Sequence, residues 1–139
     1  MELNHRCLDV SQKSCRNYTA DMRDHKKLRA FELADELALA VYKHTAEFPR
    51  DEQFGLTSQM RRASVSIASN IVEGCARDSS ADYVRFLDMA YGSSCELQYQ
   101  ISLARRLEYL AKEFADELDE LSRETCKVLN GLIRSLRKQ

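Results

Sequence analysis

The sequence has few residues that turn or break a chain. Its 139 residues include one proline, four glycines and no tryptophan. An all-β fold needs many turns, and turns are built largely from glycine, proline and short polar residues. The shortage of breakers therefore favours a few long helices, and the length suits a single domain.

The sequence also lacks an excess of charge of either sign. It has 21 basic and 22 acidic residues, for a formal net charge of −1. A nucleic-acid-binding protein usually carries a basic excess, so the overall charge gives no support to that class. A local basic face remains open.

Long apolar runs are missing as well. None approaches the ~18–20 residues of a membrane span. Residues 1–21 also lack the apolar core of a signal peptide. We therefore expect a cytoplasmic protein with no membrane partner.

Clusters of metal-ligating residues are absent from the sequence too. Five cysteines are widely scattered, with no C-x-x-C pair: Cys7, Cys15, Cys75, Cys95 and Cys126. The three histidines are equally dispersed: His5, His25 and His44. A disulfide framework or a zinc site would show tighter spacing. The pattern predicts no metal and no cofactor, with reduced thiols packed as small apolar residues.

A regular pattern begins at Met22. Residues 1–21 are polar and show no sustained period, so they predict a disordered N-terminal extension, and Met22 is a candidate for the natural start. Residues 22–139 predict one folded domain. Four segments of this domain have the apolar period of amphipathic helices: Lys26–Glu47, Glu52 or Thr57 to Ala76, Ser79 or Ser80 to Leu110, and Lys112–Leu136.

Short connections between consecutive helices imply antiparallel neighbours. The predicted fold class is therefore all-α, an antiparallel up-down-up-down four-helix bundle. In the last helix, the predicted core stripe has alternating spacings of four and three residues: Phe114, Leu118, Leu121, Thr125, Val128, Leu132 and Leu136. Gly92 interrupts the third helix, and we expect a tight helix crossing to offset its cost.

No catalytic constellation is recognisable. Ser64, Ser66 and Ser69 lie within a predicted helix, and no histidine shares their segment. A di-iron bundle would need Glu-x-x-His pairs on two helices, and the sequence has none. We therefore do not expect an enzyme.

Asn70 and Glu73 form a polar pair on one face near the end of the second predicted helix. One interpretation is a contact to a ligand or partner. The favoured one is a hydrogen-bonded structural pair that fixes the turn into the third helix, since buried polar groups are usually satisfied internally.

Arginines provide the other candidate site: Arg61, Arg62, Arg77, Arg85, Arg105 and Arg106. If they meet on one face, they would bind phosphate groups. The alternative is a solvated face with intrahelical pairs, such as Arg85 with Asp82 or Asp88. Tyr91 and Tyr99, if they point outward, are candidate anchors for self-association; core packing is the simpler account of either one.

Four ordered motifs resemble a known family. They are Tyr42-x5-Phe48-Pro49, Glu52-x-Phe54-Gly55-Leu56-Thr57-x-Gln59-x-Arg61-Arg62-Ala63, Ser66-x-x-Ser69-Asn70-Ile71-x-Glu73-Gly74-x-x-Arg77 and Phe86-Leu87-x-x-Ala90-x-Gly92-Ser93-x-x-Glu96-Leu97. Together they resemble the four-helix bundle family encoded in intervening sequences of bacterial 23S ribosomal RNA genes. The resemblance extends over roughly residues 24–136.

This resemblance implies a four-helix bundle that assembles into a homopentameric ring. It also links the chain to the accessory variability proteins of diversity-generating retroelements, which are thought to bind nucleic acid and a reverse transcriptase through a basic surface. By motif position, the residues implied for such a surface are Arg61, Arg62, Arg77 and Arg85.

Our leading hypothesis is a non-enzymatic, homo-oligomeric module that binds RNA or a nucleoprotein complex. The alternative is a protein-interaction scaffold that docks a partner protein without nucleic acid.

Overall fold

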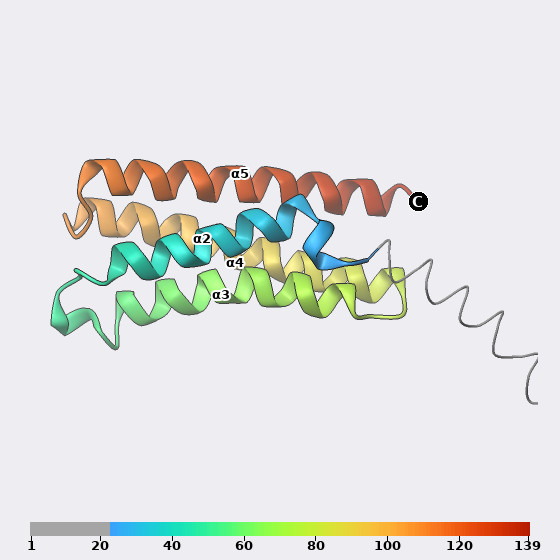
Figure 1. Ribbon diagram of the computed structural model, residues 1–139, viewed down its shortest axis with the longest axis horizontal. Helices are drawn as coiled ribbons and strands as arrows, with labels where there is room; N and C mark the ends of the chain where they lie inside the picture. The colour runs from blue at the N-terminus through green and yellow to red at the C-terminus, as the bar shows by residue number, and fades with distance from the viewer. Residues whose placement is uncertain (1–22) are drawn as a thin grey trace, which may run out of the picture.

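The computed structural model describes residues 23–139 and contains four long helices (Figure 1). They are α2 (Arg29–Thr45), α3 (Leu56–Cys75), α4 (Ser80–Arg106) and α5 (Lys112–Arg137), with short 3-10 turns at η1 (His25–Lys27) and η2 (Arg50–Glu52). The all-α prediction is confirmed. The predicted extension at residues 1–21 and the start at Met22 lie outside the described residues.

The helices run alternately up and down along one long axis (Figure 1). Each helix packs against the next in the chain, and α5 also packs against α2. The start of α2, the α3–α4 connection and the C-terminus therefore share one end of the bundle. No helix of residues 23–139 combines the length and the apolar character that a membrane span needs.

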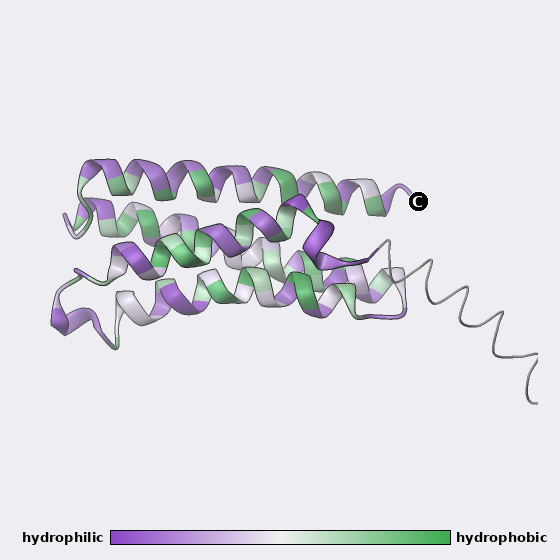
Figure 2. Cartoon of the chain, viewed as in Figure 1, coloured by the Kyte–Doolittle hydropathy of each residue, from purple (hydrophilic) through white to green (hydrophobic). Residues whose placement is uncertain are grey.

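The core follows from the amphipathic period of each helix. Figure 2 shows apolar and polar residues alternating along the ribbons, as this period requires. Helices α2, α3 and α4 each bury one apolar stripe, with Leu37, Ile67 and Leu97 fully enclosed. Leu107, directly after the end of α4, is 45% exposed.

The predicted stripe of α5 is rotated from the observed one. Phe114 is 46% exposed, and Leu121, Val128, Leu132 and Leu136 are half-buried. The buried residues of α5 include two members of the predicted stripe, Leu118 and Thr125. The other buried residues lie next to predicted positions: Ala115, Ser122, Leu129 and Ile133. Because α5 contacts both α2 and α4, its apolar surface is wider than one seam, and its small residues face the centre.

Two helix ends differ from the prediction by three residues or more. The chain forms the η1 turn and an extended Leu28 before α2, so α2 begins at Arg29 instead of Lys26. Helix α4 ends at Arg106 instead of Leu110, because Glu108 adopts a left-handed φ of 62°. The Tyr109 amide then donates to the Ala104 carbonyl at 3.0 Å, and the Glu108 amide donates to the Arg105 carbonyl at 3.0 Å. This pattern is a Schellman motif.

The tight helix crossing expected at Gly92 is wrong. A Cβ at Gly92 would meet nothing within 4 Å. The close approach is at Gly74 on α3, where a Cβ would lie 3.0 Å from the Phe86 Cβ and 3.1 Å from the Tyr83 Cδ2 of α4. This contact draws the two helices together beside their connection.

Candidate nucleic-acid interface

The six candidate arginines lie in three separate places. Arg77 and Arg85 flank the α3–α4 connection, Arg61 and Arg62 lie on the first half of α3, and Arg105 and Arg106 end α4. Helix α3 runs back along the bundle, so its ends lie at opposite ends of the molecule (Figure 1). A single face containing all six is therefore not formed within one chain.

Arg77 and Arg85 converge on one aromatic ring. The Arg77 guanidinium carbon lies 4.4 Å from the centre of the Phe86 ring, and that of Arg85 lies 5.3 Å from it. Such cation–π contacts hold guanidinium groups in place while leaving their N–H donors to face solvent. The local reason is the short α3–α4 connection, which brings the end of one helix beside the start of the next.

Arg23, which precedes η1, contacts the same connection. Its guanidinium donates to the Arg77 carbonyl and, at 3.3 Å, to Ser80 Oγ. Its Cζ also lies 5.3 Å from the centre of the Tyr83 ring. We call Arg23, Arg77 and Arg85 the arginine cluster.

The start of α4 fixes the geometry beneath the arginine cluster. Ser79 caps the helix by accepting a hydrogen bond from the Asp82 amide at 3.1 Å. Asp82 also lies 3.6 Å from Arg85, and both side chains are more than half exposed. The intrahelical pair expected for Arg85 is thus present with Asp82, whereas Asp88 pairs with Arg137 at 2.6 Å. An exposed pair of this kind neutralises Arg85 only weakly.

Arg61 has a structural role instead. Its Nε donates to Thr45 Oγ1 at 2.9 Å, and its Cζ stacks 4.7 Å from the centre of the Tyr42 ring. Both partners belong to α2 and its end, so Arg61 fastens α3 to α2. This role could not be predicted from the sequence, because it depends on the neighbouring helix.

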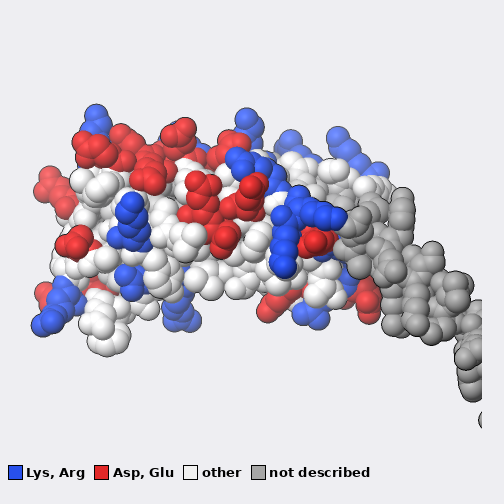
Figure 3. All heavy atoms as spheres, in the orientation of Figure 1, with Lys and Arg blue, Asp and Glu red and all other residues white. Residues whose placement is uncertain are grey.

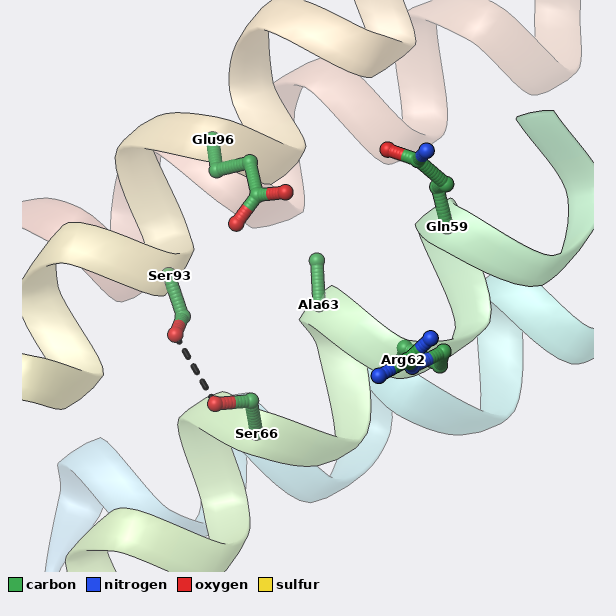
Figure 4. Close-up of a pocket in the computed structure, with 6 residues that line it drawn as sticks. All are labelled: Gln59, Arg62, Ala63, Ser66, Ser93 and Glu96. Carbon is green, nitrogen blue, oxygen red and sulfur yellow. Dashed lines mark hydrogen bonds between the residues drawn. The ribbon is translucent and has the colours of Figure 1, made fainter. Parts of the chain in front are cut away.

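Arg62 is exposed and lines a shallow groove of about 420 Å³ between α3 and α4 (Figure 4). Ser66 and Ser93 face each other across the groove floor at 2.9 Å between their hydroxyl oxygens. Glu96 lies on the opposite wall from Arg62. The groove thus carries charges of both signs and does not favour a polyanion.

Arg105 and Arg106 lie at an acidic end of the molecule. Arg105 Nη2 pairs with Asp116 Oδ1 at 2.7 Å, and Arg106 Nε donates to the Ser102 carbonyl at 3.3 Å. Figure 3 shows acidic side chains crowded over the first half of α5, near this end. The acidic residues there are Glu113, Asp116, Glu117, Asp119, Glu120 and Glu124.

The bundle end with the arginine cluster has the opposite balance. Figure 3 shows basic side chains gathered toward the start of α2 and the C-terminus. The basic residues of this end are Arg23, Lys26, Lys27, Arg29, Arg77, Arg85, Arg134, Arg137 and Lys138, against Asp24, Glu32, Glu73, Asp78, Asp82 and Asp88. The net charge of −1 therefore conceals a separation of charge along the bundle.

The pair expected between Asn70 and Glu73 is not formed. Asn70 Nδ2 donates to the Ser66 carbonyl at 2.9 Å and to Ser66 Oγ at 3.1 Å, one turn earlier on α3. Glu73 is exposed. Asn70 thus extends the Ser66–Ser93 contact between α3 and α4, and it does not fix the turn.

Sequence reasoning missed Arg23 and Phe86. Arg23 lies before the first periodic segment and outside the family motifs, so no pattern marked it. Phe86 belongs to a motif, but its role depends on the arginines on both sides. Both tyrosines that were candidate anchors for self-association are exposed, Tyr99 at 61% and Tyr91 at 36%. Within residues 23–139, no three His, Cys, Asp or Glu side chains are grouped so that they could hold a metal ion.

Comparisons with known proteins identify the fold and the family. The crystal structure of a protein of unknown function from the S23 ribosomal protein family of Bacteroides thetaiotaomicron VPI-5482 is similar, with a TM-score of 0.69 and 25% sequence identity. The similarity covers 76% of this chain and 95% of that one. No curated protein matches. The family model described as 23S rRNA-intervening sequence protein matches residues 26–131, which include α2, α3, α4 and most of α5. The resemblance seen in the motifs is thereby confirmed, and the chain belongs to the 23S rRNA-intervening sequence protein family.

Proposed function

We propose that this protein is a non-enzymatic, homo-oligomeric module that binds RNA, alone or in a nucleoprotein complex, through the arginine cluster. The observation that carries the proposal is the convergence of Arg77 and Arg85 on Phe86, with Arg23 beside them. Guanidinium groups match the planar, bidentate geometry of phosphate oxygens. Three of them at one bundle end suit a backbone phosphate contact.

The separation of charge supports the same surface. A polyanion is attracted to the basic end and repelled by the acidic first half of α5, so the field orients its approach. Such binding is dominated by counterion release, which makes it weak at physiological salt and steeply dependent on salt concentration.

The experiment compares two charge-reversed variants in binding to a fluorescent single-stranded RNA. Arg77→Glu with Arg85→Glu removes the proposed contacts. Arg50→Glu with Arg106→Glu makes the same change in net charge at the opposite end, where both side chains are exposed. We expect the first variant to lose at least tenfold in affinity at low salt and the second to lose much less.

Circular dichroism and thermal unfolding show whether both variants keep the fold. Equal losses in the two variants would mean that net charge alone matters, and the arginine cluster would be rejected as the site. Absence of binding by the unaltered protein at low salt would reject RNA as the ligand. Reversal of Arg61 is unsuitable as a test, because its bonds to α2 are structural.

Self-association is the second part of the proposal, and the family resemblance implies a ring of five. Several apolar residues on the outer surface of α2 and α3 would contact a second copy of the chain: Phe31, Ala38, Tyr42, Val65, Ala68 and Val72. Light scattering should give five times the 16.0 kDa of one chain. Val65→Glu should lower this mass, since it would bury an unpaired charge in the interface between copies. Lys127→Glu, at an exposed position on α5, should leave the mass unchanged. A monomer at working concentration would overturn this part.

A protein-interaction scaffold is the alternative function, and one feature favours it. Phe54 is 92% exposed beside η2, and Leu39 is 68% exposed on α2. Large exposed apolar side chains often mark protein contacts. Purification at mild salt distinguishes the two functions. A peak with the 260/280 nm absorbance ratio of nucleic acid supports RNA binding, and a clean peak that carries a specific protein supports the scaffold.

A further inference from the structure

Two cysteines lie at the same level on the neighbouring helices α4 and α5. The register of these antiparallel helices is marked by the Arg105–Asp116 ion pair at 2.7 Å. Ten residues back along α4 from Arg105 is Cys95, and ten residues forward along α5 from Asp116 is Cys126. Equal steps in opposite directions along antiparallel helices stay level with each other, so the two cysteines lie at the same height along the bundle.

The side-chain contacts agree with this register. The Cys126 sulfur lies 3.1 Å from Ser94 Oγ and 3.9 Å from Gln98 Oε1. On α4, Ser94 directly precedes Cys95, and Gln98 follows it by three residues. Cys95 is the largest cause that raises the pKa of the Tyr91 hydroxyl, and Cys126 adds to this rise, so the three side chains lie close together. Both thiols therefore occupy one small site on the outer side of the interface.

The two thiols differ in access to solvent. Cys95 is exposed, whereas Cys126 is half-buried. Burial raises the pKa of the Cys126 thiol, contact with Ser94 lowers it, and the neighbouring Cys95 raises it again. An exposed thiol that meets oxidants first, backed by a half-buried one, is the arrangement of an attacking and a resolving cysteine. Cys75, the remaining described cysteine, lies on α3 beside the Tyr83 hydroxyl at 3.9 Å.

We propose that Cys95 and Cys126 form a reversible disulfide that links α4 to α5, made by exchange with a small-molecule disulfide such as oxidised glutathione. The site is independent of the arginine cluster and of the proposed RNA binding. It makes the stability of the α4–α5 hairpin respond to the redox state of the surroundings.

The exchange proceeds in two balanced steps. The Cys95 thiolate attacks one sulfur of the small disulfide, breaks its S–S bond and releases one small thiolate. The Cys126 thiolate then attacks the Cys95 sulfur of the mixed disulfide and releases the second small thiolate. The protein loses two protons and two electrons in total, and the small disulfide is reduced to two thiols.

The bond would close a loop that contains the α4–α5 connection. Closing a loop restricts the unfolded chain and stabilises the folded one. The disulfide would also join α4 to α5 midway between two ion pairs, Arg105–Asp116 at 2.7 Å and Asp88–Arg137 at 2.6 Å. We expect the melting temperature to rise by several degrees on oxidation and to return on reduction.

The test incubates the full chain with oxidised glutathione and analyses it by intact mass and peptide mapping. The expected product has lost two hydrogens and gives a linked peptide pair with Cys95 and Cys126. Peptide mapping is needed because the chain also contains Cys7, Cys15 and Cys75. This first experiment uses the unaltered protein and needs no substitution.

Single substitutions separate the roles of the two thiols. Cys126→Ser should trap a glutathione adduct on Cys95, because the resolving thiol is gone. Cys95→Ser should leave Cys126 largely unmodified, and the matched control Cys75→Ser should form the Cys95–Cys126 bond as the unaltered chain does. The proposal would be overturned if either cysteine were linked to a different cysteine. It would also be overturned if both thiols stayed free under conditions that modify Cys75.

Discussion

His44 Nε2 lies 2.9 Å from Glu117 Oε2, and this contact joins the end of α2 to the first half of α5. The His44 side chain is 2% exposed, and its ring stacks on Phe114 with 4.4 Å between centroids. An ionised carboxylate only accepts hydrogen bonds, so the histidine ring is the donor. Phe114 fell on the predicted core stripe, but it acts as a partly exposed cover over a buried histidine.

Replacing His44 should cost more than neutralising its partner. His44→Ala removes a buried ring and its hydrogen bond, so we expect a loss of about 2–3 kcal/mol in the free energy of unfolding. Glu117→Gln keeps an acceptor oxygen and should cost less than about 1 kcal/mol. Urea unfolding at neutral pH measures both. Equal losses would show that the charge of Glu117, and not the burial of the ring, dominates this contact.

Two of the three glycines in the family motifs should respond oppositely to alanine. Gly74→Ala places a Cβ 3.0 Å from the Phe86 Cβ and 3.3 Å from the Tyr83 carbonyl oxygen. We expect it to destabilise the protein by about 1–3 kcal/mol, because α3 and α4 must separate. Gly92→Ala meets nothing within 4 Å and should stabilise helix α4 by about 0.5–1 kcal/mol.

Gly131 serves as the control, since a Cβ there also meets nothing within 4 Å. Gly131→Ala should behave like Gly92→Ala in thermal unfolding. If Gly92→Ala destabilised the protein while Gly131→Ala stabilised it, Gly92 would have to make a close contact that is not present within one chain.

The number, order and direction of the helices could be predicted from the sequence, because each helix has one broad apolar stripe and short connections. The face of α5 could not. Its central positions include Ala115, Ser122 and Thr125, whose small side chains hardly stand out from polar neighbours, while Leu121 and Val128 lie to one side. Hydrophobic size marks which residues avoid water, but the packing of two neighbouring helices decides which of them is central.

The candidate site was only partly predictable. Arg77 and Arg85 flank a short helix connection, so their proximity follows from the antiparallel pattern. The roles of Arg61 and Arg105 could not be foreseen, because their partners Thr45 and Asp116 lie on neighbouring helices. A count of charges likewise hides their separation along the bundle, which depends on how the helices align.

The end of α4 was missed because its left-handed position is not a glycine. Glu108 has a φ of 62°, which costs a residue with a Cβ about 1 kcal/mol or more. Glu108→Gly should therefore stabilise the protein by about 0.5–1 kcal/mol, since the relief of strain exceeds the added freedom of the unfolded chain. Glu108→Ala removes the same charge and keeps the Cβ, so it should not stabilise. An equal gain in both variants, measured by thermal unfolding, would assign the effect to charge.

Alkaline pH should weaken the contact between α3 and α4. Burial is the largest cause that raises the pKa of Tyr83 far above its usual range, and the nearby Cys75 adds to it. Burial also raises the pKa of the Cys75 thiol, whose sulfur lies 3.9 Å from the Tyr83 hydroxyl. Both groups hold their protons more tightly in the folded state than in the unfolded state.

The sign of the effect follows from proton linkage. The unfolded chain releases these protons near pH 8.5 for cysteine and about pH 10 for tyrosine, while the folded chain still retains them. The contribution of these two groups to the free energy of unfolding is therefore complete below about pH 8, and it falls as the pH rises through these values. Tyr83→Phe keeps the ring in its packing and should flatten the decline measured by urea unfolding from pH 7 to 10.5. Tyr99→Phe, at a position that is 61% exposed, should leave the decline unchanged. If both variants declined as steeply as the unaltered protein, other groups would have to account for the loss of stability.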